Sequence, residues 1–163
     1  MAERSTRIVH NGFNLSITFN ADAVRQVIFN QITTQPICNL ALLGEKQVSI
    51  INQFKKYLDG EISALESVAF KEIGTEYQKK VWSYLRSTQV GQTYSYSEVA
   101  KAIDSHPRAV GQACRKNPLP LITPCHRIVS INGLGGFVGQ IEGYTLTLKT
   151  RLLKNEQSFA NNI

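Results

Sequence analysis

The chain has 163 residues, of which 42% are apolar and 18% charged, and its formal net charge is +6. This length can bury a core in one medium domain or two small ones, and the positive charge favours an anionic partner. The three cysteines are odd in number and share no CxxC spacing, which argues against a disulfide framework and a zinc site. There is neither a signal-peptide core nor a run of about 18 apolar residues. We therefore expect no membrane partner, no metal, and a location in the cytoplasm, or in the nucleus of a eukaryote.

The first third of the chain predicts a small α/β unit. Apolar and polar residues alternate over residues 13–19, directly after a turn-like Asn-Gly pair, which predicts a hairpin with a half-buried second strand. Residues 22–44 show no clear period. An amphipathic helix is predicted from Glu45, with Gly60 as its stop.

The middle of the chain predicts a helix-turn-helix. Ser95 stands three residues before Glu98, the spacing of a capping box, and Pro107 suits the first turn of a following helix. A glycine inside that second helix costs about 1 kcal/mol relative to alanine, which the close approach of another surface would explain. Packing against a helix of the same protein explains it equally well, and the charges then form only a solvated face. The small and charged residues of this helix are Arg108, Ala109, Gly111, Gln112, Ala113, Arg115 and Lys116.

The segment Pro124-Cys125-His126-Arg127 is the strongest candidate for chemistry. A thiolate is the nucleophilic form of cysteine, and a neighbouring base or cation promotes its formation. The alternative is that Cys125 is simply a small core residue. A glycine-dense loop follows, and then a helix that we expect to end at residues 154–156. Its Glu156 is a candidate third member that orients His126.

These motifs resemble those of the O6-alkylguanine-DNA alkyltransferases, the methylated-DNA–protein-cysteine methyltransferases. The match runs from Gly74 to Glu156 and is weak in the N-terminal unit, where residues 53–60 carry it. The matching segments are residues 74–82, 95–100, 107–113, 117–120 and 123–129, the last reading Thr-Pro-Cys-His-Arg-Ile-Val.

The resemblance implies a role for each candidate residue. Cys125 accepts the alkyl group, His126 acts as its base through a water, Glu156 polarises the histidine, and Tyr96 donates to the departing guanine. Arg108 enters the base stack in place of the flipped nucleotide, and the rest of its helix contacts the DNA. The pocket for the flipped base is formed by Tyr96, Asn117, Pro120, Gly135, Gly136, Phe137 and Val138.

The sequence thus predicts an α/β N-terminal domain over residues 1–68, ribonuclease-H-like by resemblance. It predicts a mainly α C-terminal domain over residues 69–163 with a winged helix-turn-helix motif. By resemblance, the protein is a monomer that repairs O6-alkylguanine, with O4-alkylthymine as a second candidate lesion, in double-stranded DNA. It transfers the alkyl group irreversibly to Cys125, once per molecule and without a cofactor. The alternatives are a non-catalytic lesion-binding protein, a cysteine hydrolase and a plain helix-turn-helix regulator.

Overall fold

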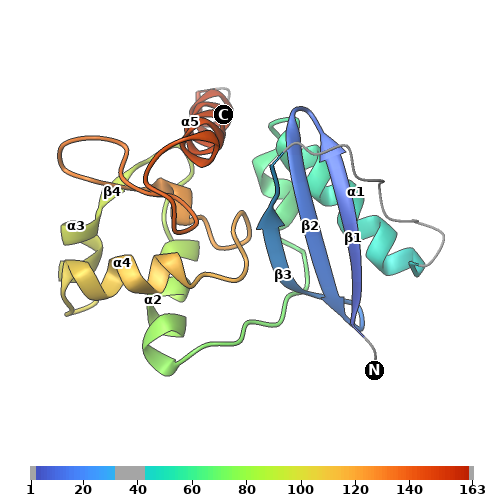
Figure 1. Ribbon diagram of the computed structural model, residues 1–163, viewed down its shortest axis with the longest axis horizontal. Helices are drawn as coiled ribbons and strands as arrows, with labels where there is room; N and C mark the ends of the chain where they lie inside the picture. The colour runs from blue at the N-terminus through green and yellow to red at the C-terminus, as the bar shows by residue number, and fades with distance from the viewer. Residues whose placement is uncertain (1–2, 32–42, 162–163) are drawn as a thin grey trace.

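The structure is a computed structural model that describes residues 3–31 and 43–161. Its N-terminal part is a three-stranded antiparallel sheet with one long helix packed against it (Figure 1). The sheet order is β1-β2-β3, and the alternating apolar residues of the central strand are buried in the core. The elements of this part are β1 (Arg4–His10), β2 (Phe13–Asn20), β3 (Ala23–Phe29), α1 (Glu45–Leu58) and the 3-10 turn η2 (Ile62–Leu65).

The predicted hairpin and the predicted helix α1 are both present, whereas strand β3 was not predicted. The two buried residues of β3, Val24 and Val27, are three positions apart, so they do not show the two-residue period of a strand. The cause is a register shift opposite them, between Thr18 and Phe19 of β2. Of the segment that the sequence left unassigned, residues 32–42 lie outside the described residues.

The C-terminal part consists of helices around one short parallel strand pair, β4 with β5. The capping box of Ser95 and Glu98 and the first-turn position of Pro107 are both confirmed. The last helix ends at Ala160, beyond the predicted end at residues 154–156. Glu156 therefore lies inside the helix, where it is buried in the core. The elements are α2 (Glu76–Arg86), β4 (Tyr94–Ser95), α3 (Tyr96–Ala102), α4 (Pro107–Arg115), η3 (Cys125–Arg127), β5 (Ile128–Val129) and α5 (Tyr144–Ala160).

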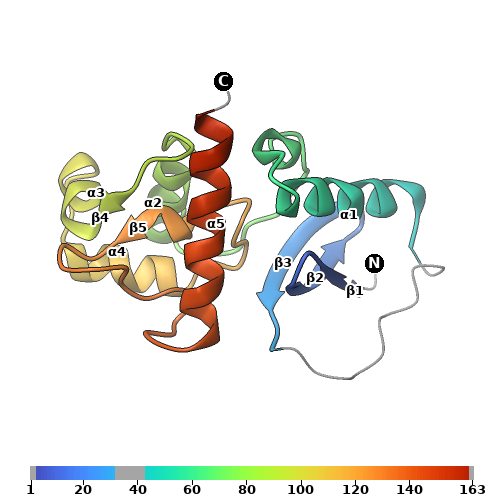
Figure 2. The same ribbon diagram turned by 90° about the horizontal axis from the view of Figure 1, so that it is seen from above.

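The two parts meet along the outer edge of β3 and along α5. The amide of Val27 donates to the carbonyl of Pro118 at 2.9 Å, and Val24 exchanges backbone hydrogen bonds with Ala69 and Lys71. Helix α5 lies between the N-terminal part and the other C-terminal elements (Figure 2). None of the helices in the described ranges has the length and apolar character needed to cross a membrane.

Candidate active site

Cys125 begins the 3-10 turn η3 and is buried, with 5% of its surface exposed. It lies on the wall of a cavity of about 180 Å³. Tyr96 at the start of α3 forms another wall, α4 contributes Gly111 and Cys114, and the loop over residues 136–141 completes the lining. The structure therefore places the thiol where a small group can enter and reach it.

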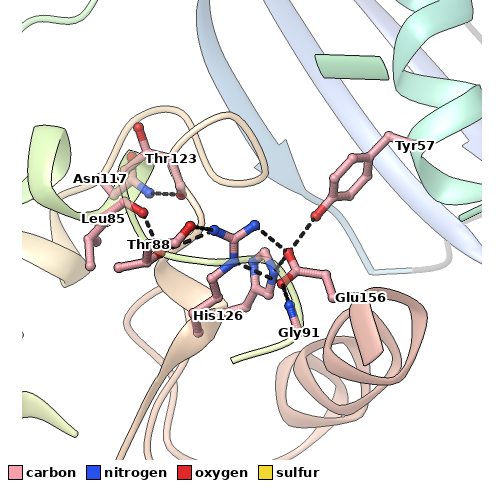
Figure 3. A network of polar contacts seen from close by, with 9 residues as sticks. Tyr57, Leu85, Thr88, Gly91, Asn117, Thr123, His126 and Glu156 are labelled. Carbon is pink, nitrogen blue, oxygen red and sulfur yellow. Dashed lines mark hydrogen bonds and ion pairs between the residues drawn. The ribbon is translucent and has the colours of Figure 1, made fainter. Parts of the chain in front are cut away.

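Glu156 gathers the polar groups next to Cys125 into one buried network (Figure 3). His126 Nε2 lies 2.7 Å from Glu156 Oε1, and Arg127 donates to both carboxylate oxygens at 2.8 and 3.0 Å. The same guanidinium also donates to the carbonyl of Thr88, and the amide of Gly91 donates to Glu156. The structure thus brings together the three residues that the sequence singled out as nucleophile, base and orienting carboxylate.

This network fixes which imidazole nitrogen is available to accept a proton. Burial alone would raise the pKa of Glu156, but hydrogen bonds and charges from His126 and Arg127 outweigh it and lower that pKa to about 2. An ionised carboxylate only accepts hydrogen bonds, so Nε2 of His126 must donate. The other nitrogen, Nδ1, is buried and has no hydrogen-bond partner among the described residues. It is therefore free to accept a proton.

The thiol at rest is held in its protonated form. Burial raises the pKa of Cys125, while a hydrogen bond with Asn117 and the charge of Lys149 act in the opposite direction. A base must therefore take the thiol proton at the moment of attack. Tyr96 keeps its hydroxyl proton and can donate a hydrogen bond into the cavity, because burial and the nearby thiols raise its pKa to about 12.

The other predicted pocket residues occupy three places. Gly136, Phe137 and Val138 line the cavity of Cys125, where the ring of Phe137 meets the His126 ring edge-on. Asn117 and Pro120 line an adjacent cavity of about 240 Å³ on the other side of Val138. Asn117 also joins α4 to the active-site loop, since its amide donates to the carbonyl of Thr123 and its side-chain oxygen accepts from the amide of Leu119. Gly135 packs against Ser130, where an added Cβ would lie 2.8 Å from its hydroxyl.

A tight turn forms the rim of the cavity. Phe137 and Gln140 exchange both backbone hydrogen bonds, and the two residues between them have positive φ angles, 43° for Val138 and 82° for Gly139. Two such residues define a type I′ turn, which glycine adopts readily and a β-branched residue does not. Val138 is therefore held in a strained conformation at the mouth of the pocket.

Lys149 is a residue of the site that sequence reasoning missed. It is fully buried on α5, and its ammonium donates to three backbone carbonyls, those of Ile128, Leu134 and Gly136, at 2.5, 2.6 and 2.9 Å. All three ammonium protons are thus used to fix the glycine-dense loop, which ends in the pocket wall. A lysine in an otherwise apolar helix stripe is the signal that could have revealed it.

The predicted DNA-contacting helix α4 has one exposed and one buried face. Arg108, Gln112, Arg115 and Lys116 are exposed, and Ala109 and Gly111 are half-buried. A Cβ added at Gly111 would meet only the ring of Tyr96, at 3.7 Å, so packing within the described residues does not require a glycine there. Ala113 differs from the prediction: it is buried, and its carbonyl accepts from Trp82 Nε1. It therefore cannot contact a partner unless α4 moves.

Comparisons with known proteins identify the family of this chain. A family model described as "6-O-methylguanine DNA methyltransferase, DNA binding domain" matches residues 76–158. The methylated-DNA–protein-cysteine methyltransferase of Methanocaldococcus jannaschii is 40% identical over 133 residues, which cover 82% of this chain and 77% of the relative. The crystal structure of the Mycobacterium tuberculosis O6-methylguanine methyltransferase superposes with a TM-score of 0.72 at 24% identity, covering 96% of this chain and 94% of that one. A Mycobacterium tuberculosis relative solved in complex with DNA gives a TM-score of 0.70, also at 24% identity and covering 96% and 93%. From the family model and the sequence relative together, the chain belongs to the methylated-DNA–protein-cysteine methyltransferase family.

Proposed function

We propose that this protein repairs O6-alkylguanine, and as a second lesion O4-alkylthymine, in double-stranded DNA by moving the alkyl group to Cys125. The observation that carries the proposal is a buried thiol on a cavity wall, next to an imidazole whose one nitrogen is bound to a carboxylate and whose other nitrogen is unpartnered. No redox step or group carrier is needed for such a transfer. The function therefore requires no cofactor.

The transfer follows from the roles of four side chains. A water between Cys125 and His126 Nδ1 carries the thiol proton to the imidazole, and Glu156 stabilises the resulting cation. The sulfur then forms a bond to the alkyl carbon while the bond from that carbon to guanine O6 breaks. The hydroxyl of Tyr96 donates a hydrogen bond to the departing guanine, which takes a proton from solvent while the imidazolium returns its own proton to solvent. A thioether does not release its alkyl group, so each molecule reacts once.

A base inside a duplex cannot reach a cavity of this kind, so the lesion must leave the stack, which costs a few kcal/mol. Arg108 is exposed at the first turn of α4 and is proposed to fill the vacated space. Gln112, Arg115 and Lys116 lie on the same helix and are proposed to contact the phosphates, which gives affinity without sequence preference.

We further propose that residues 1–68 form a ribonuclease-H-like domain and residues 69–163 a domain with a winged helix-turn-helix. The three-stranded sheet with α1 supports the first assignment, and the pair α3 and α4 with the β4–β5 strands supports the second. One chain contains every proposed catalytic group, which favours action as a monomer. A cytoplasmic or, in a eukaryote, nuclear location fits a protein that acts on DNA.

The test of the function is the intact mass of the protein after incubation with duplex DNA that contains one O6-methylguanine. We expect a gain of one methyl group on Cys125 and no further gain with excess DNA. A cysteine hydrolase would return to its starting mass, and a lesion-binding protein would show no change. Either result would refute the proposed transfer.

Replacing Arg108 with alanine is expected to slow repair of duplex DNA strongly and to leave the reaction with free O6-benzylguanine unchanged. The reason is that Arg108 is proposed to fill the space that a flipped base leaves in the duplex, and a free base leaves no such space. The measurement is the second-order rate constant for each substrate at one salt concentration. If both rates fell together, Arg108 would be needed for the shape of the pocket, and the proposal that it fills the space left by the flipped base would be wrong.

Replacing Lys149 with methionine is expected to slow both substrates together. The change leaves three carbonyls without their donor, each at a cost of about 1–3 kcal/mol when buried, and releases the pocket wall at Gly136. A displacement of about 1 Å in a reaction site can lower a rate by about a hundredfold. Lys154→Met, on the exposed face of the same helix, is the matched control. Unchanged rates in Lys149→Met would show that the glycine-dense loop holds its shape without the three hydrogen bonds from the lysine.

A further inference from the structure

One contact to the catalytic carboxylate comes from the other part of the molecule. The hydroxyl of Tyr57, near the end of α1, donates to Glu156 Oε1 at 3.4 Å, across 99 positions of sequence (Figure 3). That oxygen also accepts from His126 and Arg127, both of η3. Among the described residues, Tyr57 is thus the point where the N-terminal part reaches the proton-transfer network.

Tyr57 is held firmly enough to act on this network. It is buried, with 2% of its surface exposed. The carbonyl of the next residue, Leu58, accepts from Asn155 of α5 at 3.5 Å and from Asn11 of the β1–β2 turn at 3.0 Å. Arg151 of α5 in turn donates to the carbonyl of Asn11 at 2.5 Å, and its guanidinium lies 4.3 Å from the centre of the Phe13 ring. Hydrogen bonds therefore hold the end of α1 against α5, the helix that carries Glu156.

We propose that Tyr57 is a positioning residue for alkyl transfer, which sets the proton affinity of His126 through Glu156. A hydroxyl that donates to a carboxylate takes up part of its negative charge, and the carboxylate then holds an imidazolium less strongly. The N-terminal part thus contributes to the chemistry as well as to the fold. This inference rests on the proposed function, in which His126 is the base.

The other ionisable groups around this network are Cys125 and Arg127 of η3 and Lys149 of α5, and each keeps its own partners when the Tyr57 hydroxyl is removed. Glu156 loses one of its donors and keeps the other four contacts. Tyr57→Phe deletes one oxygen atom and keeps the ring that fills the core. Its effect can therefore be assigned to a single hydrogen bond.

The test compares Tyr57→Phe with Tyr77→Phe, a control that loses a 2.7 Å hydroxyl contact to Ser105 outside the site. The rate constant for alkylation of Cys125 by free O6-benzylguanine is measured against pH. In Tyr57→Phe we expect the acidic fall in rate to move to higher pH by about 0.5 unit, a roughly threefold change in the proton equilibrium, because the imidazole binds its proton more tightly. Tyr77→Phe is expected to follow the wild type.

A second readout needs no alkylation. The ring protons of His126 are followed by NMR against pH in the wild type and both variants, and the same upward displacement is expected in Tyr57→Phe alone. Coincident curves for Tyr57→Phe and the wild type, in rate and in NMR, would overturn the inference. A wild-type protein that is not alkylated at Cys125 would instead overturn the proposed function, while the NMR comparison would still decide the role of Tyr57.

Discussion

Replacing Cys125 with alanine is expected to abolish alkyl transfer and to leave DNA binding intact. The change removes the sulfur that forms the new bond, whereas the exposed residues of α4 that are proposed to contact DNA stay in place. The loss of one buried sulfur costs about 1 kcal/mol of stability, so the variant should remain folded. The measurement pairs intact mass with a binding assay on duplex DNA that carries the lesion.

Cys114→Ala is the matched control for this experiment. Cys114 lines the same cavity as Cys125, and burial raises the pKa of both thiols, but it is Cys125 that directly precedes His126 in the turn η3. We expect Cys114→Ala to accept the alkyl group on Cys125, and peptide mapping to locate it there. Alkyl found on Cys114, or on Cys38 outside the described residues, would refute the assignment of the nucleophile.

His126→Ala and Glu156→Gln are both expected to slow transfer far more than they weaken DNA binding. Loss of a general base lowers a rate by about 10²–10⁴-fold, and His126 is the base of the proposed route. Glu156→Gln removes the charge that stabilises the imidazolium. It also leaves the guanidinium of Arg127 buried without its counter-ion, which costs about 3–5 kcal/mol. Transfer at the wild-type rate in Glu156→Gln would return Glu156 to a purely structural role.

The same variant has a distinct dependence of stability on pH. The pKa of Glu156 is lowered from 4.5 to about 2 by His126 and Arg127 against the effect of burial, so the ionised form stabilises the native state. That stabilisation, about 3 kcal/mol, is complete above pH 4.5 and is lost as the pH falls toward 2. In urea unfolding, the difference in free energy between the wild type and Glu156→Gln should therefore shrink over this window. A constant difference would contradict the lowered pKa.

Local signals in the sequence were enough for most elements of the C-terminal part. A capping box and a first-turn proline marked α3 and α4, because each satisfies backbone groups within a few residues. Glu156 was only a candidate partner of His126 from the residues themselves, since 30 positions separate the two, and the resemblance was needed to assign it a role. Strand β3 was missed because a bulge in its neighbour breaks the period on which strand prediction depends.

Two contributors to the site were beyond sequence reasoning for a different reason. Lys149 has no polar partner close in sequence, and its three acceptors are carbonyls, which every residue carries. Tyr57 stands in a helix whose apolar face explains a tyrosine without any functional role. Both contacts exist only once distant segments have packed. A lysine in an apolar helix stripe signals that Lys149 has buried partners without saying which, and the sequence gives no signal for Tyr57.

The short parallel ladder of β4 and β5 has a consequence for what the pocket can admit. It pairs Tyr94 with Ile128 and Ser95 with Val129. Strand β4 ends directly before Tyr96, and strand β5 begins directly after Arg127. Backbone hydrogen bonds therefore join the segment that leads into Tyr96 to the segment that follows the Cys125 turn, and these bonds do not involve side chains. The rim, by contrast, is the strained turn at Val138, where replacing the side chain alters width and relieves strain together. If the cavity takes alkylated bases as proposed, we expect substitutions at Val138, rather than at the strand pair, to change which alkyl groups it admits.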